Sequence, residues 1–437
     1  MADAALRLTA LVEEFLGERL PVRIRAWDGS ESGPPGAPVL VLRSRRALRR
    51  LLWKPGELGL ARAWVAGDID VEGDLYEALD LLAALIWERE PAPEDAVHPV
   101  RDPRTRAFAK GLLRLAGPGL PPPPPPEEMR RRSGALHTRR RDKAAISHHY
   151  DVGNDFYELV LGPSMVYSCG YWQDGGTLEE AQRDKLDLVC RKLALKEGDR
   201  LLDVGCGWGS MAIHAAREYG ARVTGVTLSA EQAAYARKRV ADEGLSERVE
   251  IRVQDYRDVR DGPYDAVSSI GMAEHVGAVR FREYADDVLA LLKPGGRLLN
   301  HQIARRPEKD EAAYHVDEFI DAYVFPDGEL APVGRTVTIL EEAGFEARDV
   351  ESIREHYALT LRRWVANLER HQDRAAGLTS PGRARVWRLY MAASALAFEH
   401  NRIGVNQILA VRPAAGGASR MPLRARTWTE QTPATTA

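Results

Sequence analysis

The chain has 437 residues, of which 44% are hydrophobic and 29% charged, a composition typical of globular proteins, and its length favours two or three domains. Its 61 Lys and Arg nearly balance its 64 Asp and Glu, and a net charge of −3 argues against nucleic acid or another bulk polyanion as a partner. The three cysteines, Cys169, Cys190 and Cys206, have no spacing that predicts a disulfide framework or a metal site, and they suit a reducing cytoplasm.

The first 115 residues have the pattern of a small α+β domain. An amphipathic helix is expected before residue 17, followed by strands at 22–27 and 39–42 and a helix at 45–53. The first 20 residues carry acidic side chains and lack the features of a signal peptide, and no apolar run is long enough to span a membrane. Because this part offers neither a nucleophile nor a metal cluster, we expect an accessory or lipid-binding domain.

Residues 116–145 are predicted to be a linker. Residues 121–126 are all proline, which forms a stiff, extended segment, and basic runs follow at 130–132 and 139–141. A solvated charged segment is the simplest interpretation. The alternative is a patch that rests on anionic lipid headgroups, where each basic residue adds roughly 1 kcal/mol.

Residues 146–172 are rich in aromatic and small polar side chains. The stretch 147–157 leads into 162–172, whose composition is poor helix material. We expect a lid or wall across a pocket. Ordinary core aromatics are the alternative, and that interpretation is reasonable for Phe156.

The glycine-rich turn at 201–210 is the stretch around which the rest of the chain is organised. An apolar strand ends near Asp203, glycines follow at 205, 207 and 209, and helical sequence begins directly afterwards. Glycine permits the dihedrals of such a turn and lets a ligand approach the backbone, and the helix start offers free N–H groups. The order Asp-x-Gly-x-Gly-x-Gly resembles the first motif of S-adenosylmethionine-dependent methyltransferases, although an ordinary glycine-rich βα turn would look similar.

Further strands are expected at 221–229, 249–253, 265–270 and 291–300, with helical sequence between them. This alternation predicts a parallel, doubly wound sheet, which binds ligands at the carboxyl edge of its strands. Thr227 stands where many methyltransferases have a ribose-binding acid, so Gln232 would have to share that role, and Asp255 could accept from the adenine amine. The other polar residues expected at this edge are Asp203, Glu274 and His301.

Beyond the sheet, residues 314–330 and a helical region at 354–409 are expected to wall an acyl tunnel. Core packing is the default interpretation of the apolar stripe in that region. Residues 412–437 are rich in Pro, Ala, Gly and Thr and predict a disordered tail.

Several motifs in order, spread over residues 146–410, together resemble the cyclopropane fatty-acyl-phospholipid synthases, with a weaker match around 56–74. They are His-Tyr-Asp-Val-Gly-Asn at 149–154, Tyr-Ser-Cys-Gly-Tyr-Trp at 167–172, the glycine turn, Gly-Val-Thr-Leu-Ser at 225–229, Gly-Met-Ala-Glu-His-Val-Gly at 271–277, Phe-Pro at 325–326 and His-Tyr at 356–357.

The resemblance implies an α/β fold, with a doubly wound (Rossmann-like) class I methyltransferase domain at 146–411 beside the smaller α+β N-terminal domain. It implies transfer of the methyl of S-adenosylmethionine to a cis double bond of a phospholipid acyl chain, with a bicarbonate ion held beside the reacting centre. The implied catalytic positions are Cys169, Glu274, His301, Ile303 and Tyr357. The expected cofactor-binding positions are Tyr167, Ser168, Asp203, Gly205, Gly207, Gly209, Thr227, Leu228, Gln232, Asp255 and Tyr256.

The implied chemistry explains why such residues are needed. An alkene is a weak nucleophile, so orientation against the sulfonium methyl matters, and aromatic faces can stabilise the carbocation that results. Ring closure then needs a base, and a small bound anion suits this, held by His301, Tyr357 and backbone N–H groups near Cys169 and Ile303. Glu274 would orient that anion's proton and pass it outward. Taken singly, Cys169 could be a small buried residue, His301 a satisfied histidine and Tyr357 a helix-surface tyrosine.

We therefore expect a cyclopropane synthase that acts on unsaturated phospholipid, is cytoplasmic and is associated peripherally with the inner face of the membrane, with a homodimer left open. The closest alternative is a fatty-acyl methyltransferase that leaves a methylene or methyl branch. A methyltransferase for a soluble small molecule and a non-catalytic lipid carrier fit the linker and the glycine turn less well. No nucleic acid or metal is expected, and double-bond position and headgroup preference stay open.

Overall fold

The structure is a computed structural model that describes residues 3–86, 103–129, 138, 141, 152–311, 314–424 and 426. The chain forms two compact units. Unit 1 comprises Met1–Arg131, Asp317–Val324 and Ser380–Leu396, and unit 2 comprises Arg132–Val316, Phe325–Thr379 and Ala397–Ala437. Both units are therefore assembled from segments that are far apart in the sequence.

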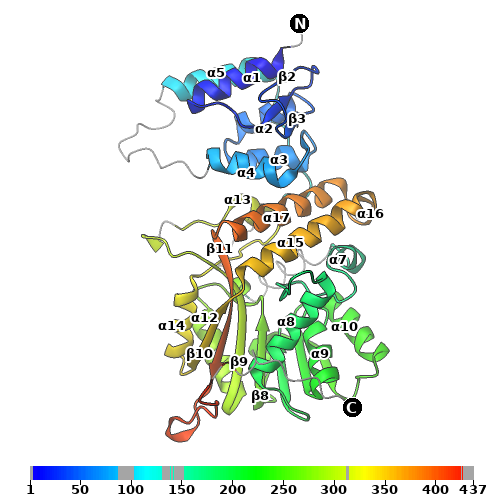
Figure 1. Ribbon diagram of the computed structural model, residues 1–437, viewed down its shortest axis with the longest axis vertical. Coiled ribbons are helices and arrows are strands. Elements are labelled where there is room, and N and C mark those ends of the chain that lie inside the picture. Colours follow the sequence, from blue (N-terminus) through cyan, green and yellow to red (C-terminus); the bar gives the residue numbers. More distant parts are fainter. Residues whose placement is uncertain are drawn as a thin grey trace. The chain divides into compact units, whose positions relative to one another are not determined.

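Unit 1 contains the helices and strands expected near the N-terminus. They are α1 (Ala4–Leu16), β1 (Arg23–Arg25), β3 (Val39–Leu42) and α2 (Arg46–Trp53). With β2 (Glu31–Ser32) and β4 (Ile69–Glu72) the strands form a sheet in the order β2-β1-β3-β4, in which β1 and β3 are parallel. The helices α3 (Glu57–Val65), α4 (Leu75–Ile86) and α5 (Pro103–Ala116) complete this part (Figure 1). Its core is apolar, with Leu8, Ile24, Leu42 and Leu48 buried.

Residues 116–129, the first part of the expected linker, pack within unit 1. The Arg50 guanidinium donates to the Pro123 carbonyl at 2.8 Å, and Glu128 accepts from Arg62 at 2.5 Å and from the Tyr323 hydroxyl at 2.9 Å. Tyr323 belongs to α13 (Glu318–Tyr323), and α17 (Pro381–Glu399) adds most of its length to the same unit. The basic residues 130–132, 139 and 140 lie outside the described residues.

Unit 2 is built on a seven-stranded sheet in the order β10-β11-β9-β8-β5-β6-β7. The strands β5 (Arg200–Val204), β6 (Arg222–Thr227), β7 (Val249–Val253), β8 (Tyr264–Ile270) and β9 (Leu292–Arg305) are parallel to one another. The predicted doubly wound α/β fold is therefore confirmed, because each strand of this series crosses over to a parallel neighbour.

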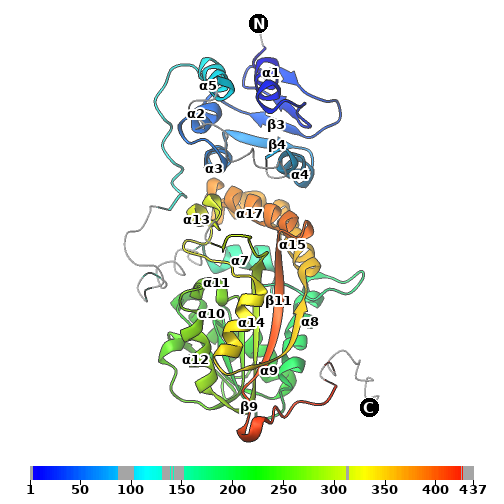
Figure 2. The same ribbon diagram turned by 90° about the vertical axis from the view of Figure 1, so that its left-hand side faces the viewer.

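Helices cover both faces of this sheet, and each face has its own apolar core (Figures 1 and 2). One face packs against α8 (Leu178–Leu193), α9 (Ser210–Tyr219) and α10 (Ala230–Asp242), and the other against α12 (Phe281–Leu291) and α14 (Val333–Glu342). The N-terminus of α8 is set by a capping box between Thr177 and Glu180, and that of α10 by the Ser229 side chain. The shorter helices of unit 2 are α7 (Asn154–Leu161), α11 (Ala273–Val276) and α16 (Gln372–Leu378).

The other edge of the sheet corrects one prediction. The region 354–409 was expected to be helical, and α15 (Arg354–Arg370) agrees, but Ile403–Val411 forms strand β11. It pairs antiparallel with β9 and with β10 (Glu346–Ser352), so its backbone groups are satisfied on both sides. The apolar run is consequently a buried central strand, for which sequence alone cannot distinguish strand from helix.

The start of the expected disordered tail is ordered. Arg412 donates to the Leu292 carbonyl at 2.6 Å, and Arg426 donates to Asp349 at 2.8 Å. Residues 427–437 lie outside the described residues. No helix in the described part of the chain is long and apolar enough to cross a membrane.

Candidate cofactor and catalytic site

The glycine turn lies between β5 and α9, and its three glycines have different surroundings. All have left-handed backbones, with φ of 74° at Gly205, 53° at Gly207 and 81° at Gly209. A Cβ on Gly205 would lie 2.3 Å from the sulfur of Met272, and one on Gly209 would lie 3.1 Å from Cβ of Ala236. A Cβ on Gly207 would have Nε2 of Gln232 as its nearest neighbour, 3.9 Å away. Gly205 and Gly209 are therefore required by packing, whereas Gly207 leaves space for a ligand.

A cleft opens beside Gly207 at the carboxyl edge of the sheet. Seven of the predicted cofactor residues line it, namely Gly205, Gly207, Thr227, Leu228, Gln232, Asp255 and Tyr256. The other four, Tyr167, Ser168, Asp203 and Gly209, do not line this cleft. Residues that the sequence did not single out also contribute, among them Arg257, Met272 and His275.

Thr227 and Gln232 act as a pair. The Thr227 hydroxyl donates to Oε1 of Gln232 at 3.0 Å, and the Gln232 backbone is held by Ser229 at 3.2 Å. With Oε1 oriented in this way, the Gln232 amide Nε2 is the group nearest Gly207. The pair therefore presents amide donors where many methyltransferases present an acid.

Asp255 lines the cleft but is strongly engaged. Both of its carboxylate oxygens accept from Arg257, at 2.8 Å from Nε and 2.6 Å from the guanidinium terminus. The Arg257 backbone N–H also donates to Oδ1 of Asp255 at 3.0 Å, so an adenine amine at this position would share the acid with Arg257. The sequence analysis did not single out Arg257, although its place two residues after Asp255 was a signal for this pair.

Asp203 is buried beneath the glycine turn. Its Oδ1 accepts from the Ser268 hydroxyl at 2.7 Å, while Oδ2 has no hydrogen-bond partner among the residues that the structure describes. Burial raises the pKa of this carboxyl to about 6, against the opposing effects of Ser268 and of Lys185.

Lys185 of α8 is an additional buried charge that sequence reasoning missed. Its ammonium donates to the hydroxyl of Ser168 at 2.9 Å, and its side chain is fully enclosed. Burial lowers its pKa to about 8, while the nearby Cys169 and Asp203 act in the opposite direction. Ser168 is thus placed against this lysine.

Glu274 of α11 is the most exceptional acid of the site. Its Oε1 accepts from the backbone N–H of Ile303 at 2.7 Å, and its Oε2 is buried with no partner in the described part of the chain. Burial raises its pKa to about 7. The Ile303 amide therefore holds Glu274, and Glu274 keeps one free acceptor in a dry environment where a general base can operate near neutral pH.

His301, Cys169 and Tyr357 are all buried. Burial, together with the charges of Lys185 and Lys192, lowers the pKa of His301 well below its ordinary value, so the imidazole is neutral. The Cys169 thiol donates to the Gly170 carbonyl at 3.1 Å, and burial raises its pKa, which disfavours the nucleophilic thiolate form.

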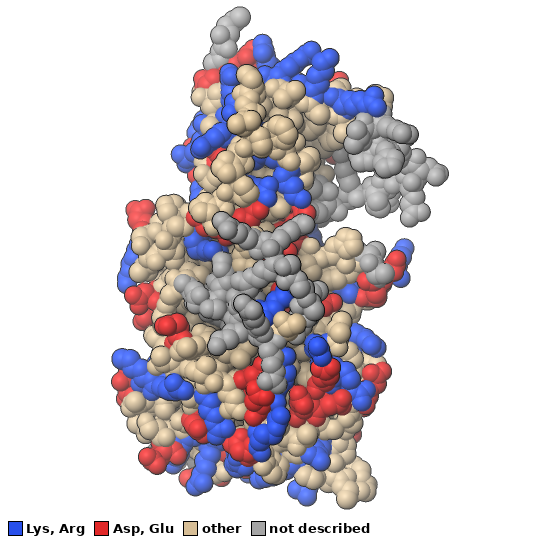
Figure 3. All heavy atoms as spheres, turned by 180° about the vertical axis from the view of Figure 1, so that it is seen from behind, with Lys and Arg blue, Asp and Glu red and all other residues tan. Residues whose placement is uncertain are grey.

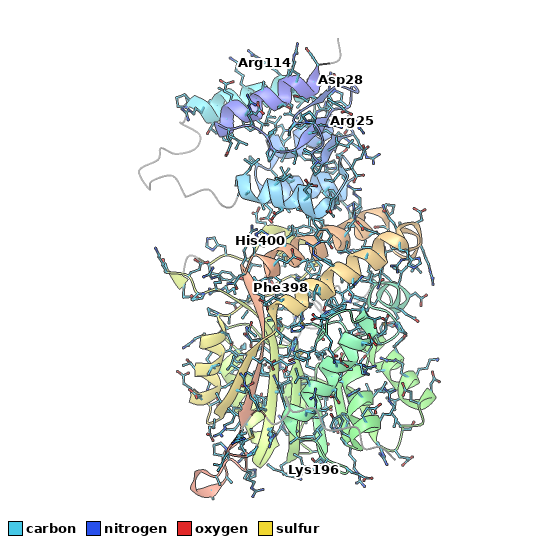
Figure 4. All side chains as sticks on the ribbon, in the orientation of Figure 1. Arg25, Asp28, Arg114, Lys196, Phe398 and His400 are labelled. Carbon is cyan, nitrogen blue, oxygen red and sulfur yellow. The ribbon has the colours of Figure 1, made fainter. Side chains whose placement is uncertain are left out.

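A continuous series of aromatic rings connects the glycine turn with Tyr357. Tyr157 stands 4.6 Å from Trp208 and 5.6 Å from Tyr167, measured between ring centroids. Tyr167 is 5.5 Å from Trp364, which is 6.0 Å from Tyr357, and Tyr357 is 4.8 Å from Phe398, labelled in Figure 4. Such a wall excludes water and offers π faces to a positive charge.

Comparison with known proteins assigns relatives to most of the chain. Residues 137–408 match the family model described as mycolic acid cyclopropane synthetase. A probable fatty acid methyltransferase of Mycobacterium tuberculosis is 43% identical over 97% of this chain and 99% of its own length. The cyclopropane-fatty-acyl-phospholipid synthase of Escherichia coli K12 is 38% identical over 64% of this chain and 71% of its own length.

A solved structure is similar as well. The mycolic acid cyclopropane synthase CmaA1, complexed with SAH and CTAB, superposes with a TM-score of 0.58 and 33% identity. The match covers 61% of this chain and 97% of CmaA1.

Proposed function

Because this chain belongs to the mycolic acid cyclopropane synthetase family of S-adenosylmethionine-dependent lipid methyltransferases, we propose that it methylates a cis double bond in an unsaturated phospholipid acyl chain and closes a cyclopropane ring. The observation that carries the proposal is Glu274, whose Oε2 is buried without a partner in the described part of the chain and whose pKa is raised to about 7. Ring closure requires removal of a proton, and Glu274 is suited to take it.

The cleft beside Gly207 fits S-adenosylmethionine. The glycine without a close neighbour lets the ligand approach the backbone, and the Gln232 amide faces the same space. The Thr227–Gln232 pair would bind the ribose hydroxyls, and Asp255 and Tyr256 would lie at the adenine. When bound, S-adenosylmethionine supplies an electrophilic methyl group.

The chemistry of Glu274, His301 and Tyr357 also fits a bicarbonate ion. Oε2 of Glu274, which has no partner among the described residues, would accept a hydrogen bond from the ion, and the neutral imidazole of His301 and the hydroxyl of Tyr357 would hold its oxygens. When bound, bicarbonate would supply a base beside the reacting carbon. Its presence follows from the family resemblance and stays part of the proposal.

The protein's own residues would then have three tasks. The aromatic wall from Trp208 to Phe398 excludes water and stabilises the positive charge that develops on the acyl chain after methyl transfer. His301 binds without taking a proton, because its pKa is low. Glu274 takes up at Oε2 the proton that the bound base removes from the transferred methyl carbon, and the electron pair left on that carbon forms the third bond of the ring.

A second candidate is a fatty-acyl methyltransferase that loses a different proton and leaves a methylene branch, or forms a methyl branch after reduction. The relative at 43% identity is named a probable fatty acid methyltransferase, and this name favours the second candidate. Both candidates use the same cofactor cleft and the same aromatic wall.

The product separates the two candidates. The gene would be expressed in a host that lacks such an enzyme, and the lipids would be analysed by gas chromatography and NMR. A ring gives proton signals upfield of all other acyl signals, whereas a methylene branch gives vinyl signals, although their masses are equal. Upfield ring signals that disappear with Glu274→Gln support the proposal, and vinyl or branched-methyl signals alone would replace it with the second candidate.

We also propose peripheral contact with the cytoplasmic face of a membrane, which the lipid substrate requires. The expected basic runs lie outside the described residues except for Arg141, which is paired with Asp327 at 2.5 Å. Unit 1 offers described basic residues instead, and Figure 3 shows Lys and Arg, with some Asp and Glu, on one face of it. We define the α5 surface as Arg45, Lys110, Leu113, Arg114 and Leu120, where Leu113 is 59% and Leu120 87% exposed.

A homodimer stays a prediction, which light scattering would check.

A further inference from the structure

A buried polar chain connects α8 with His301. The antiparallel register of β9 and β11 places Gln407 directly opposite His301, on the face of the sheet that α8 covers. The Lys192 ammonium lies 2.8 Å from Oε1 of Gln407, and Nε2 of Gln407 lies 3.3 Å from Nδ1 of His301. Lys192 also pairs with Glu351, and neither Lys192 nor Gln407 is accessible to solvent.

The direction of each hydrogen bond follows from the groups involved. An ammonium can only donate, so the atom of Gln407 that faces Lys192 must be the carbonyl oxygen. The other end of the amide, which faces His301, is therefore the NH₂ group. An NH₂ group donates, and Nδ1 of His301 must accept with its lone pair. In a neutral imidazole the single proton then resides on Nε2.

We propose that Lys192, acting through Gln407, is a positioning residue that holds His301 in the tautomer with its proton on Nε2, so that the ring presents a donor to an oxyanion in the site. The oxyanion rests on the proposed function, in which it would be bicarbonate, while the tautomer rests on the contacts alone. His301 is consequently an anion-binding group, and the task of taking a proton is left to Glu274.

The surroundings of His301 agree with this assignment. Its pKa is lowered by burial and by two ammonium groups, Lys185 and Lys192, both from α8. The acids on neighbouring elements are already engaged, because Glu351 of β10 pairs with Lys192 and Glu274 of α11 accepts from the Ile303 amide two residues further along β9. A buried lysine costs stability, and a role in orienting Gln407 explains why α8 has one at a position that faces the sheet.

The test is the protonation pattern of the imidazole nitrogens, read by two-bond ¹⁵N–¹H NMR on the full chain labelled with ¹⁵N-histidine. The resonances would be assigned by their loss in His301→Gln. In mildly alkaline buffer the wild type should show an unprotonated Nδ1 and a protonated Nε2. The reverse pattern, or an imidazolium, would overturn the proposal. This measurement needs neither cofactor nor lipid. A wrong tautomer would therefore overturn this proposal without affecting the proposed function, and loss of the proposed function would not change the tautomer.

Two substitutions test the chain of contacts. In Gln407→Glu the carboxylate still accepts from Lys192 but can only accept from the ring, so the proton should move to Nδ1, and activity should fall roughly 10²–10³-fold, as for loss of an oxyanion donor. In Lys192→Met the amide is no longer anchored and a mixture of tautomers is expected. Lys192→Arg, which keeps a donor, should restore the single pattern.

The matched control is Gln302→Glu, a buried glutamine on β9 whose side chain bonds Asn300 and Thr336 on the opposite face of the sheet. Like Gln407→Glu, this substitution buries a carboxylate close to His301 in the sequence, but on the opposite face of the sheet. It should therefore leave the protonation pattern of the His301 imidazole unchanged. A folded Gln407→Glu protein that kept the proton on Nε2 as neutral imidazole would exclude the role of Gln407. A single Nε2–H tautomer in folded Lys192→Met would exclude the role of Lys192.

Discussion

At the scale of single residues, the base role proposed for Glu274 has a cost in stability. Its pKa is raised from 4.5 in the unfolded chain to about 7 by burial, so between these values the unfolded state has lost a proton that the folded state keeps. The contribution of Glu274 to stability is therefore greatest below about pH 4.5 and is lost as the pH rises to 7. At higher pH the cost of the buried charge approaches about 3 kcal/mol.

Glu274→Gln should consequently raise the free energy of unfolding by up to about 3 kcal/mol in alkaline buffer, and by little at acidic pH.

In the same variant kcat should fall roughly 10²–10⁴-fold, with the affinity for S-adenosylmethionine nearly unchanged. In the wild type kcat should rise with pH through about 7, where the base becomes ionised. Urea unfolding at two pH values measures the change in stability, and a pH–rate profile measures the change in kcat. A variant that is active at the wild-type rate would remove Glu274 from the mechanism.

Gly207 and Gly244 allow a matched test of the cofactor cleft. Both have left-handed backbones, with φ of 53° and 69°, so an alanine costs about 1 kcal/mol of strain at either position. A Cβ on Gly244 meets nothing within 4 Å, whereas on Gly207 it would project into the cleft.

Gly207→Ala should therefore weaken S-adenosylmethionine binding by roughly tenfold or more, equivalent to about 1.4 kcal/mol, while Gly244→Ala should leave it unchanged. Titration calorimetry measures the affinity, and thermal unfolding should show similar small losses in both variants. Equal affinities in the two proteins would mean that the ligand does not approach the backbone at Gly207.

The sequence predicted Glu274, Gly207 and the Thr227–Gln232 pair, because each lies next to a strand end with a recognisable pattern. It did not predict Lys185 or the orphaned oxygen of Asp203. Whether a charged side chain is buried depends on what packs over it, and that information lies in residues distant in the sequence. A signal for Lys185 existed, however, because it falls in the apolar stripe of its helix with Leu178, Ala181 and Leu188.

At the scale of elements, α8 combines an apolar stripe with two enclosed ammonium groups. Its buried face includes Gln182, Lys185 and Lys192 among apolar side chains. Burying a lysine costs free energy even when it has a partner, so Lys185 and Lys192 are expected to lower the stability of the fold. In return they place two positive charges beneath the site.

Lys185→Met is expected to show this cost directly. The pKa of Lys185 is about 8 in the folded protein, below the ordinary value of 10.5. Between these two pH values the unfolded state binds more protons than the folded state, so the stability of the wild type increases as the pH rises from 8 to 10.5. Lys185→Met should lose that pH dependence and should bind cofactor more weakly. The control is Lys196→Met, at an exposed position labelled in Figure 4. Identical pH dependence in Lys185→Met and the wild type would contradict the buried charge.

The parallel half of the sheet was predictable, and the antiparallel half was not. The strands β5 to β9 each carry a turn, a polar exit residue or a helix start that marks their ends. The strand β11 has an almost entirely buried sequence without alternation, and its identity depends on pairing with β9 more than 90 residues earlier in the chain.

At the scale of the whole molecule, the proposed membrane contact can be tested at the α5 surface. Replacement of Arg45, Lys110 and Arg114 by Gln should weaken binding to anionic vesicles by roughly 10²-fold at low salt, since each basic residue contributes about 1 kcal/mol. The effect should diminish as salt is added. The control replaces Lys196, Arg222 and Arg306, three exposed basic residues of unit 2. Equal sedimentation of both variants with anionic vesicles would reject this surface.

The division of the chain was the least predictable feature. A linear reading assigns residues 146–411 to one domain, but α13 and most of α17 belong to unit 1. The contacts that hold α17 there, such as the Trp64 indole donating to the Arg385 carbonyl at 2.9 Å, join residues more than 300 positions apart. No local pattern encodes such a contact.

The discontinuity of unit 1 also sets the order of events on the ribosome. Its sheet and first helices leave the exit tunnel early, yet Trp64 and Asp70 obtain their partner Arg385 only after nearly all of the chain has been synthesised. The nascent unit 1 must therefore wait with the Trp64 indole unpaired and its last helix missing, an incomplete state that invites aggregation or chaperone binding. Truncated proteins that end near residue 131 would retain this unfinished state permanently, whereas the full-length chain leaves it when α17 docks.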